Sequence, residues 1–211
     1  MKIEGLSFSE AGERLAERVG LQWRIQPGEE ARAKRRQLIR LANQIAARVF
    51  RDLLFSEQGR PGLDYLLERG FTEETIRRFG LGYAAQGWDS LLHALRQQGI
   101  DESIAAEAGL VKERTYGGYY DVFRNRVMFP IFDVSNRVIG FGGRALDPED
   151  PAKYLNTPDT PMFKKGQHVY GLNLARPAVV RERAVIVVEG YTDVLSLHQA
   201  GVENVVACLG T

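Results

Sequence analysis

The segment from residue 184 to residue 211 constrains the fold more than any other part of the sequence. Residues 184–188 (AVIVV) form a continuous apolar run, which is typical of a strand buried on both faces of a sheet. Residues 192–200 have a helical pattern that Gly201 stops, and residues 205–209 (VVACL) form a second apolar run. Strand, helix and strand in this order predict a βαβ unit with parallel strands and a right-handed crossover.

The preceding residues predict helices and one β-hairpin. Residues 29–56 have the period of a long helix, with an apolar stripe formed by Leu38, Leu41, Ile45, Val49 and Leu53. Shorter helices are expected over residues 7–20, 62–69, 72–79, 88–98 and 101–107, and a turn is expected at 59–62. Two strands, 127–132 and 138–141, are expected to pair around a turn at 133–136. The expected fold class is therefore α/β: a mixed α+β amino-terminal part followed by the βαβ unit of a parallel sheet.

The charge balance is neutral overall and uneven locally. The 28 Lys and Arg residues against 27 Asp and Glu exclude a globally basic nucleic-acid coat and an acidic solvating tail. From Arg32 to Arg51, however, there are seven basic residues and no acidic one. This helix face is either simply solvated or faces phosphates or a partner.

Cysteine and histidine usage excludes several kinds of site. The single cysteine, Cys208, rules out an intramolecular disulfide and a cysteine-based zinc site, and its apolar surroundings predict a buried side chain. His93, His168 and His198 are not spaced as metal ligands, so we expect structural roles for them. The sequence also lacks a long apolar stretch and a secretory signal, which favours a cytoplasmic protein with no membrane partner.

Two carboxylates follow the first predicted strand of the βαβ unit. Ligands of parallel α/β sheets bind at the carboxyl ends of the strands, where Glu189 and then Gly190 are expected. Glu189 can hold a divalent cation or act as a general acid or base. Asp193, in the first turn of the helix, either joins it as a metal ligand or merely complements the helix dipole.

Basic and amide side chains gather in the hairpin and in the long polar loop at 147–166. They are Arg124, Arg126, Arg144, Lys153, Asn156, Lys164 and Lys165. Arginine contacts phosphate through two parallel hydrogen bonds and lysine acts as a point charge, so these residues together suit phosphate groups beside a metal. Each cation alone is better explained as a solvated surface charge, but their joint placement around one β-rich segment favours the binding role.

Several motifs, in order, resemble those of one family. VEGYTDV (188–194) followed by VVACLGT (205–211) resembles the start of the TOPRIM domain. The narrower resemblance is to bacterial DnaG-type DNA primases, through FRNRVMFPI (123–131), RVIGFGGR (137–144), KYLNTP (153–158), FKKG (163–166) and YGL (170–172).

The resemblance implies a nucleotidyltransferase that makes short RNA primers on single-stranded DNA from ribonucleoside triphosphates. It implies Mg²⁺ or Mn²⁺ as cofactor, Glu189 as a catalytic and metal-site carboxylate, and the seven basic and amide residues as the lining of the nucleic-acid and nucleotide path. It divides the chain into the end of a zinc-domain region with a linker (1–28), the amino-terminal subdomain of the catalytic core (29–180) and a truncated TOPRIM domain (184–211).

The resemblance also implies parts and partners that lie outside this sequence. Zn²⁺ belongs to a zinc-binding domain that the chain lacks, and the replicative helicase binds through an absent C-terminal domain. A single-stranded DNA-binding protein is a further expected partner, at the replication fork on the nucleoid. We expect the 211-residue chain alone to be inactive. The alternatives are another TOPRIM enzyme (a topoisomerase or a nuclease), or a non-catalytic module that binds single-stranded nucleic acid.

Overall fold

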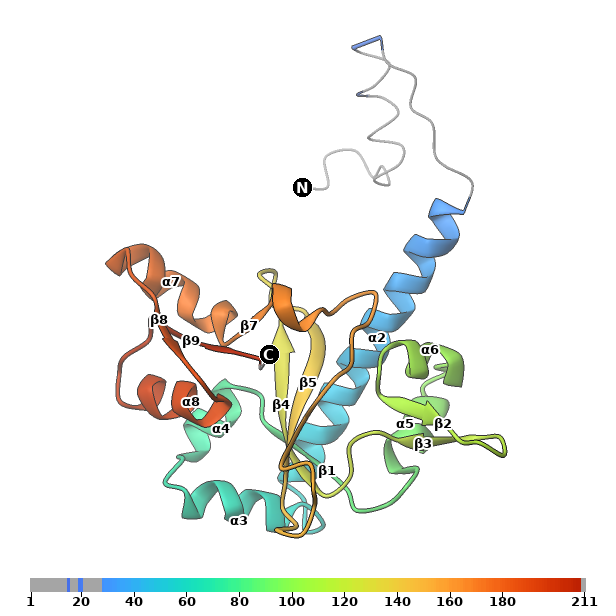
Figure 1. Cartoon of the computed structure of the whole chain (residues 1–211), viewed down its shortest axis with the longest axis horizontal. Coiled ribbons are helices and arrows are strands. Elements are labelled where there is room, and N and C mark those ends of the chain that lie inside the picture. The colour runs from blue at the N-terminus through green and yellow to red at the C-terminus, as the bar shows by residue number, and fades with distance from the viewer. Residues whose placement is uncertain (1–14, 16–18, 21–27, 210–211) are drawn as a thin grey trace. The chain divides into compact units, whose positions relative to one another are not determined.

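The computed structural model describes residue 15, residues 19–20 and residues 28–209 (Figure 1). Most of the helix predicted over 7–20 lies outside the described residues. Contacts divide the chain into Met1–Arg35 and Arg36–Thr211. The long helix at residues 29–54 begins in the first unit, and every other element below belongs to the second. None of the described helices is both long enough and apolar enough to cross a membrane.

The long helix α2, Glu29–Leu54, begins where the sequence predicts and ends two residues earlier than expected. Acidic Glu29 and Glu30 in its first turn and Arg51 in its last complement the helix dipole. Its core face consists of Ile39, Ala42, Asn43, Ile45, Ala46, Phe50 and Leu54. Of the predicted stripe, Ile45 is buried and Leu38, Val49 and Leu53 pack against the core. Leu41, in contrast, is 44% exposed, while Ile39 and Ala42, which were not predicted, are fully buried. Tertiary contacts with the sheet selected the face, and the period alone did not.

Four short helices follow: α3 (Arg60–Glu68), α4 (Glu73–Arg78), α5 (Ser90–Gln97) and α6 (Glu102–Glu107). They confirm the four predicted short helices of this region. The turn expected at 59–62 instead starts α3, because Pro61 fits the first helical turn, where no backbone N–H is needed. After each helix the chain turns at a glycine with positive φ, as at Gly80 with φ 65°.

The central sheet is antiparallel throughout, with the order β1 (Gly82–Ala84), β4 (Arg126–Phe132), β5 (Val138–Ala145) and β6 (Tyr154–Asn156). The β4–β5 pair confirms the predicted hairpin. A separate hairpin joins β2 (Val111–Glu113) to β3 (Tyr119–Asp121). The loop predicted at 147–166 is interrupted by β6, which pairs with β5, and by a 3₁₀ turn at Lys165–Gln167.

The second sheet has the order β7 (Val169–Tyr170), β9 (Val205–Cys208) and β8 (Ile186–Val188). Strands β8 and β9 are parallel and flank α8 (Tyr191–Gln199), which confirms the predicted βαβ unit. Helix α7 (Leu172–Glu182), which the sequence did not predict, precedes it and contains Pro177.

Two burial predictions for this unit are wrong. Strand β8 is not buried on both faces, since Ile186 is 43% and Val187 58% exposed. It lies at the edge of its sheet, and no described element covers these side chains. Cys208 is also exposed, although its neighbours Val206, Ala207 and Leu209 are buried.

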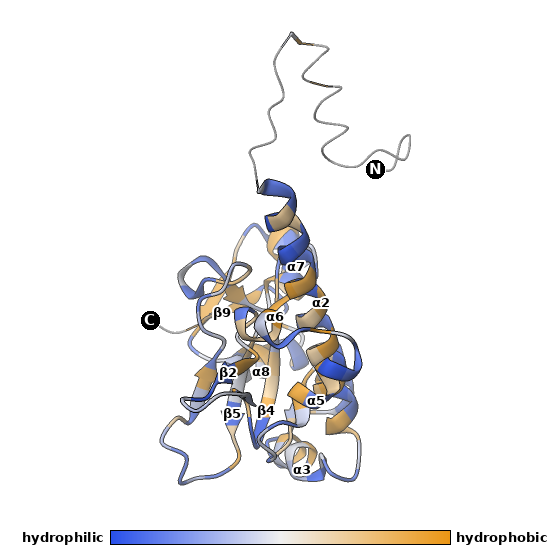
Figure 2. Cartoon of the chain, turned by 90° about the vertical axis from the view of Figure 1, so that its right-hand side faces the viewer, coloured by the Kyte–Doolittle hydropathy of each residue, from blue (hydrophilic) through white to orange (hydrophobic). Residues whose placement is uncertain are grey.

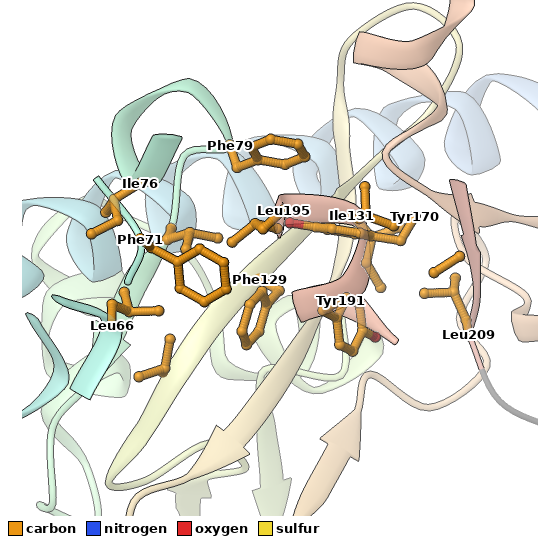
Figure 3. Packing of buried hydrophobic residues seen from close by; sticks show 14 of the residues in the cluster. Leu66, Phe71, Ile76, Phe79, Phe129, Ile131, Tyr170, Tyr191, Leu195 and Leu209 are labelled. Carbon is orange, nitrogen blue, oxygen red and sulfur yellow. The ribbon is translucent and has the colours of Figure 1, made fainter. Parts of the chain in front are cut away.

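A single hydrophobic cluster connects the two sheets (Figure 3). The ring of Tyr191 on α8 stacks on Phe129 of β4 at 4.9 Å and meets Tyr170 edge-on at 4.7 Å. Leu66 and Ile76 of α3 and α4 belong to the same cluster. In Figure 2 hydrophobic colouring runs along β4, while orange and blue residues alternate along α2. The βαβ unit thus shares its core with the preceding sheet, and the domain boundary between 180 and 184 remains a prediction.

Candidate nucleic-acid and metal site

Glu189 lies at the carboxyl end of β8, where the sequence predicts it, with an exposed side chain. Gly190 follows as the N-cap of α8. A carboxylate that is exposed beside a strand end is free to approach a substrate or a cation. This position suits both roles that the sequence predicts for Glu189.

Asp193 makes a contact of its own at the start of α8. Its Oδ2 accepts a hydrogen bond from the backbone N–H of Gly190 at 3.0 Å, so the carboxylate caps the helix. This contact supports the alternative in which Asp193 stabilises the start of the helix. A role of Asp193 as a metal ligand remains a prediction. Among the described residues, no three His, Cys, Asp or Glu side chains are grouped to hold a metal. Mg²⁺ is commonly held by one or two carboxylates together with waters and substrate phosphates, so Glu189 fits such a cation as one of its ligands.

Asn156 ties β6 to the βαβ unit. Its Nδ2 donates to the carbonyl of Leu209 at 2.8 Å, and its Oδ1 accepts from the Tyr191 hydroxyl at 2.6 Å. Burial raises the pKa of Tyr191, so this hydroxyl stays protonated as a donor. Asn156 thus positions the strand that follows Lys153 next to the segment that carries Glu189. The sequence predicted a ligand contact for this amide, and the structure shows two contacts within the chain.

Arg144 lies among aromatic rings on β5. Its guanidinium carbon is 5.8 Å from the ring centre of Tyr65 and 5.4 Å from that of Tyr154, and a guanidinium nitrogen donates to the Ala145 carbonyl at 2.6 Å. The guanidinium carbon of Arg69 lies 4.9 Å from the centre of the same Tyr65 ring. We call Tyr65, Arg69, Arg144 and Tyr154 the Arg144 cluster. Sequence reasoning missed Tyr65, Arg69 and Tyr154. The one available signal was the spacing of Tyr65 and Arg69, which places them on one face of a helix.

The lysines that the sequence singled out, Lys153, Lys164 and Lys165, have exposed side chains. Lys153 precedes Tyr154 directly, and its side chain is exposed. Lys164 and Lys165 are exposed at the 3₁₀ turn, where the backbone N–H of Lys165 donates to Asp159 Oδ1 at 3.3 Å. All three are free to meet phosphate groups from solvent.

Arg126 points into the protein. Its guanidinium pairs with Asp150 at 2.6 Å and donates to the carbonyls of Ala152 at 2.7 Å and Gly143 at 3.3 Å, and its side chain is only 5% exposed. Asn125, with φ 48°, turns the chain between Arg124 and Arg126. The nucleotide contact predicted for Arg126 is untested, but in this structure its side chain anchors the loop that leads to Lys153.

Of the three histidines, His198 is buried, while the structural roles expected for His93 and His168 remain predictions. His198 is buried against Phe79, with a ring separation of 5.2 Å, and its Nε2 lies 3.1 Å from the Val205 carbonyl. Burial lowers its pKa, so it is neutral at pH 7. His168 Nδ1 lies 2.9 Å from the Lys164 carbonyl, and His93 contacts Gln97.

The fold and the site together define a class: an antiparallel core with a basic and aromatic surface, joined to a parallel unit that carries a carboxylate at a strand end. Comparison with known families agrees with this class. Residues 49–176 match the N-terminal domain of the DNA primase catalytic core, and residues 183–211 match the Toprim domain. The chain belongs to the DNA primase catalytic core family.

Relatives and solved structures give the same assignment. A DNA primase of Deinococcus radiodurans is 47% identical over 211 residues, which is 100% of this chain and 35% of that protein. One of Halalkalibacterium halodurans is 43% identical, with the same shares. The RNA polymerase domain of Mycobacterium tuberculosis primase DnaG, in complex with a double-stranded DNA oligomer with an overhang, superposes with a TM-score of 0.79 at 38% identity, over 83% of this chain and 55% of that one. A DnaG primase catalytic domain bound to single-stranded DNA gives 0.77 at 38% identity, over 85% and 56%. The chain thus spans about a third of the length of these curated relatives.

Proposed function

We propose that this chain is the part of a DNA primase that binds single-stranded DNA and nucleotide and supplies the first acidic residue of the catalytic site. The whole protein would synthesise short RNA primers from ribonucleoside triphosphates. The observation that carries this proposal is the tie through Asn156 and Tyr191, which holds exposed Glu189 on the same unit as Lys153 and the Arg144 cluster. Nucleotidyl transfer uses a carboxylate near the reacting groups and basic side chains that bind the phosphates, and this unit carries both.

The residues of the chain have separate tasks in this reaction. The primer 3′-hydroxyl attacks the α-phosphate of the incoming nucleotide, a new phosphodiester bond forms, and pyrophosphate leaves. Arg144, Lys153, Lys164 and Lys165 bind and orient the phosphates of template and nucleotide. Glu189 would hold Mg²⁺ or Mn²⁺, with Asp193 as a second carboxylate, or would accept the proton of the attacking hydroxyl. The chemistry that a divalent cation would supply at this carboxylate is stabilisation of the negative charge that develops on the reacting phosphate.

The further partners rest on the family resemblance. A replicative helicase, a single-stranded DNA-binding protein and a zinc-binding domain would be met through other segments, and the setting would be the cytoplasm at the replication fork. The likeness to a primase domain bound to single-stranded DNA supports the template assignment.

The first test is Glu189→Gln in the intact primase. We expect primer synthesis to be abolished while single-stranded DNA binding stays largely intact, because the substitution removes one negative charge and keeps the shape. Radiolabelled primer synthesis and fluorescence anisotropy measure the two properties. Normal primer yield would exclude Glu189 from the reaction.

The second test replaces Arg144, Lys153 and Lys165 with Gln, which removes their positive charges. We expect weaker binding of single-stranded DNA and a salt dependence that is shallower by about 0.7 in log–log slope for each phosphate that is no longer neutralised. Unchanged affinity and slope would contradict the proposed path.

The alternative for the 211-residue chain by itself is a module that binds without catalysis. The described residues bring together only Glu189 and Asp193 at the strand end, which favours binding without polymerisation. DNA binding with no nucleotide incorporation in Mg²⁺ or Mn²⁺ would support this alternative, and robust synthesis would contradict it.

A further inference from the structure

A groove of about 510 Å³ lies between helix α2 and the far end of the β4–β5 hairpin. Leu41, Ile45, Arg48 and Arg51 of α2 line one wall, and Phe132 and Val138 of the hairpin line the other. We call it the α2 groove. We propose that the α2 groove binds an acidic amphipathic helix of a partner protein. The proposal does not depend on the proposed function, because it concerns a surface outside the nucleic-acid path.

The α2 groove lies on the face of the central sheet opposite the βαβ unit. Side chains along a strand alternate between the two faces. Phe129 belongs to the cluster that contains Tyr191 of α8, whereas Met128 belongs to the cluster formed with the core face of α2. Val138 packs against this second cluster and lines the groove together with its pairing partner Phe132. Figure 1 shows α2 and α8 on opposite sides of β4 and β5.

The groove is also distant from the Arg144 cluster along the strands. Val138 begins β5, and Arg144 lies near the other end of the same strand, where it pairs with Val127. At about 3.3 Å per residue, the distance along the strand from Val138 to Arg144 is about 20 Å. A ligand in the α2 groove therefore leaves the proposed nucleic-acid path open.

The floor of the groove is apolar and partly open to solvent. Leu41 and Ile45 lie one turn apart on α2, and Leu41 is 44% exposed. At the opposite wall, a Cβ added to Gly80 would lie 3.6 Å from the Cγ of Pro130, in ordinary contact. The missing side chain of Gly80 therefore leaves this part of the floor uncovered. Apolar side chains of a ligand would lose the most contact with water by binding here.

The length and the spacing of the α2 wall match a second helix. The wall extends from Leu41 to Arg51, which is about 15 Å of helix. Leu41, Ile45 and Arg48 recur every three to four positions, so their side chains form one ridge. A helix that lies along this ridge can place apolar side chains at i, i+3 or i+4 and i+7 over the same length.

The rim of the groove is positive. Arg48 and Arg51 line it, and the described lining residues include no Asp or Glu. Arg48 donates to the amide oxygen of Gln98 at 3.3 Å, a partner that carries no charge, whereas Arg51 pairs with exposed Asp52 at 3.1 Å. The stretch from Arg32 to Arg51 contains seven basic residues and no acidic one. Carboxylates beside the apolar stripe of the ligand would therefore be attracted to this rim.

Charge and shape favour this ligand over two other occupants. A second copy of the chain, bound symmetrically, would bring two arginine-lined surfaces face to face, and like charges repel. A single strand of nucleic acid needs exposed aromatic faces on which its bases can stack. Phe132 is the one aromatic side chain among the described residues that line the groove, and it is only partly exposed.

The test is binding of a labelled peptide to the full chain, measured by fluorescence anisotropy. The probe is a fluorescein-labelled peptide of about 14 residues, about 21 Å long as a helix, with leucine at every third or fourth position and glutamate and alanine between. We expect saturable binding that weakens when the salt concentration rises from about 50 to about 300 mM, because salt screens the arginines. Absence of saturable binding up to about 1 mM peptide would overturn the proposal.

Two substitutions in the groove locate the binding. Leu41→Gln should weaken peptide binding by about 10- to 100-fold, the effect expected when one leucine is no longer buried. Arg48→Gln should weaken it by about 2- to 5-fold, as for the loss of one exposed ion pair. Arg48 is exposed, so this variant tests the groove even if Leu41→Gln does not fold. Unchanged affinity in both variants would overturn the proposal.

Two matched controls lie outside the groove. Leu67 on α3 is 39% exposed, so Leu67→Gln removes a comparable leucine and should leave peptide binding unchanged. Arg36 lies on the same helix as Arg48 but about 18 Å away along it, beyond the Debye length of about 8 Å at physiological salt. Arg36→Gln should therefore also leave binding unchanged. Far-UV circular dichroism and thermal melting show whether each variant is folded.

Three further arms identify the occupant. A peptide of the same composition with a central proline should bind weakly, because proline breaks the helix, and equal binding would overturn the helical ligand. Oligo-dT that displaces the peptide and loses affinity in Leu41→Gln would assign the groove to nucleic acid instead. Self-association in analytical ultracentrifugation that Leu41→Gln abolishes would assign it to a second copy. Oligo-dT binding that Leu41→Gln leaves unchanged, beside weakened peptide binding, would support this proposal separately from the proposed function.

Discussion

Asp121 should make the stability of the protein depend on pH in a direction opposite to that of most carboxylates. Burial raises the pKa of Asp121 from its ordinary value of 3.8 to about 6, although hydrogen bonds from Leu91 and Leu92 act to lower it. Exposed Asp89 adds to the increase through charge repulsion, and Arg124 opposes it. Asp121 is 2% exposed, so solvent does little to screen these effects.

The sign follows from proton binding. Between pH 3.8 and about 6, the folded protein binds a proton at Asp121 that the unfolded chain has released. The stability that Asp121 contributes is therefore fully present below pH 3.8 and is lost as the pH rises through about 6. The folded and unfolded pKa values of Asp121 differ by about two units. At about 1.36 kcal/mol per unit, this difference corresponds to about 3 kcal/mol of stability.

The perturbation is Asp121→Asn, which keeps an acceptor for one backbone N–H and removes the titration. We expect the free energy of unfolding of the unsubstituted protein minus that of the variant to decrease by about 2–3 kcal/mol between about pH 4 and pH 7. Urea denaturation followed by far-UV circular dichroism at several pH values measures it. A difference that stays flat over this range would refute the reasoning.

Asp133→Asn is the matched control. Burial acts to raise the pKa of Asp133, but hydrogen bonds from Arg137 and Ser135 outweigh it and hold this pKa below 3.8. Its contribution is present above the unfolded pKa and is lost only as the pH falls through the lower folded value. The free energy of unfolding of the unsubstituted protein minus that of Asp133→Asn should therefore stay constant between about pH 4.5 and pH 7.

Two further substitutions probe packing and a buried ion pair. Gly142→Ala should destabilise the protein by about 1–3 kcal/mol in urea denaturation, because the added Cβ would lie 2.4 Å from the Tyr191 ring. Gly166→Ala, where nothing lies within 4 Å, is its control and should cost little. Arg126→Met should cost about 3–5 kcal/mol, because it leaves the partly buried Asp150 carboxylate without its partner. Adding Asp150→Asn should recover part of that loss, and additive losses in the double variant would contradict the ion-pair account.

The elements whose signals are local were predictable. The βαβ unit, the β4–β5 hairpin and helix α2 each follow from the spacing of apolar residues within one segment, and the structure confirms them. The position of Glu189 was also predictable, because a strand end is a local feature. Strand β6 was not, since its three residues become a strand only by pairing with β5.

The sequence by itself determined the segments with a strong local period, such as α2, the β4–β5 hairpin and the βαβ unit, and which residues carry charge. The tertiary structure decided where those charges point. Arg124 and Arg126 are equivalent in sequence, yet one stacks on Trp88 and the other is buried on Asp150. Asn156 forms hydrogen bonds that connect the two sheets, and β8 lies at an exposed sheet edge. The physical reason is that local periodicity depends on neighbours along the chain, whereas burial, ion pairing and cation–π stacking depend on residues that only folding brings together.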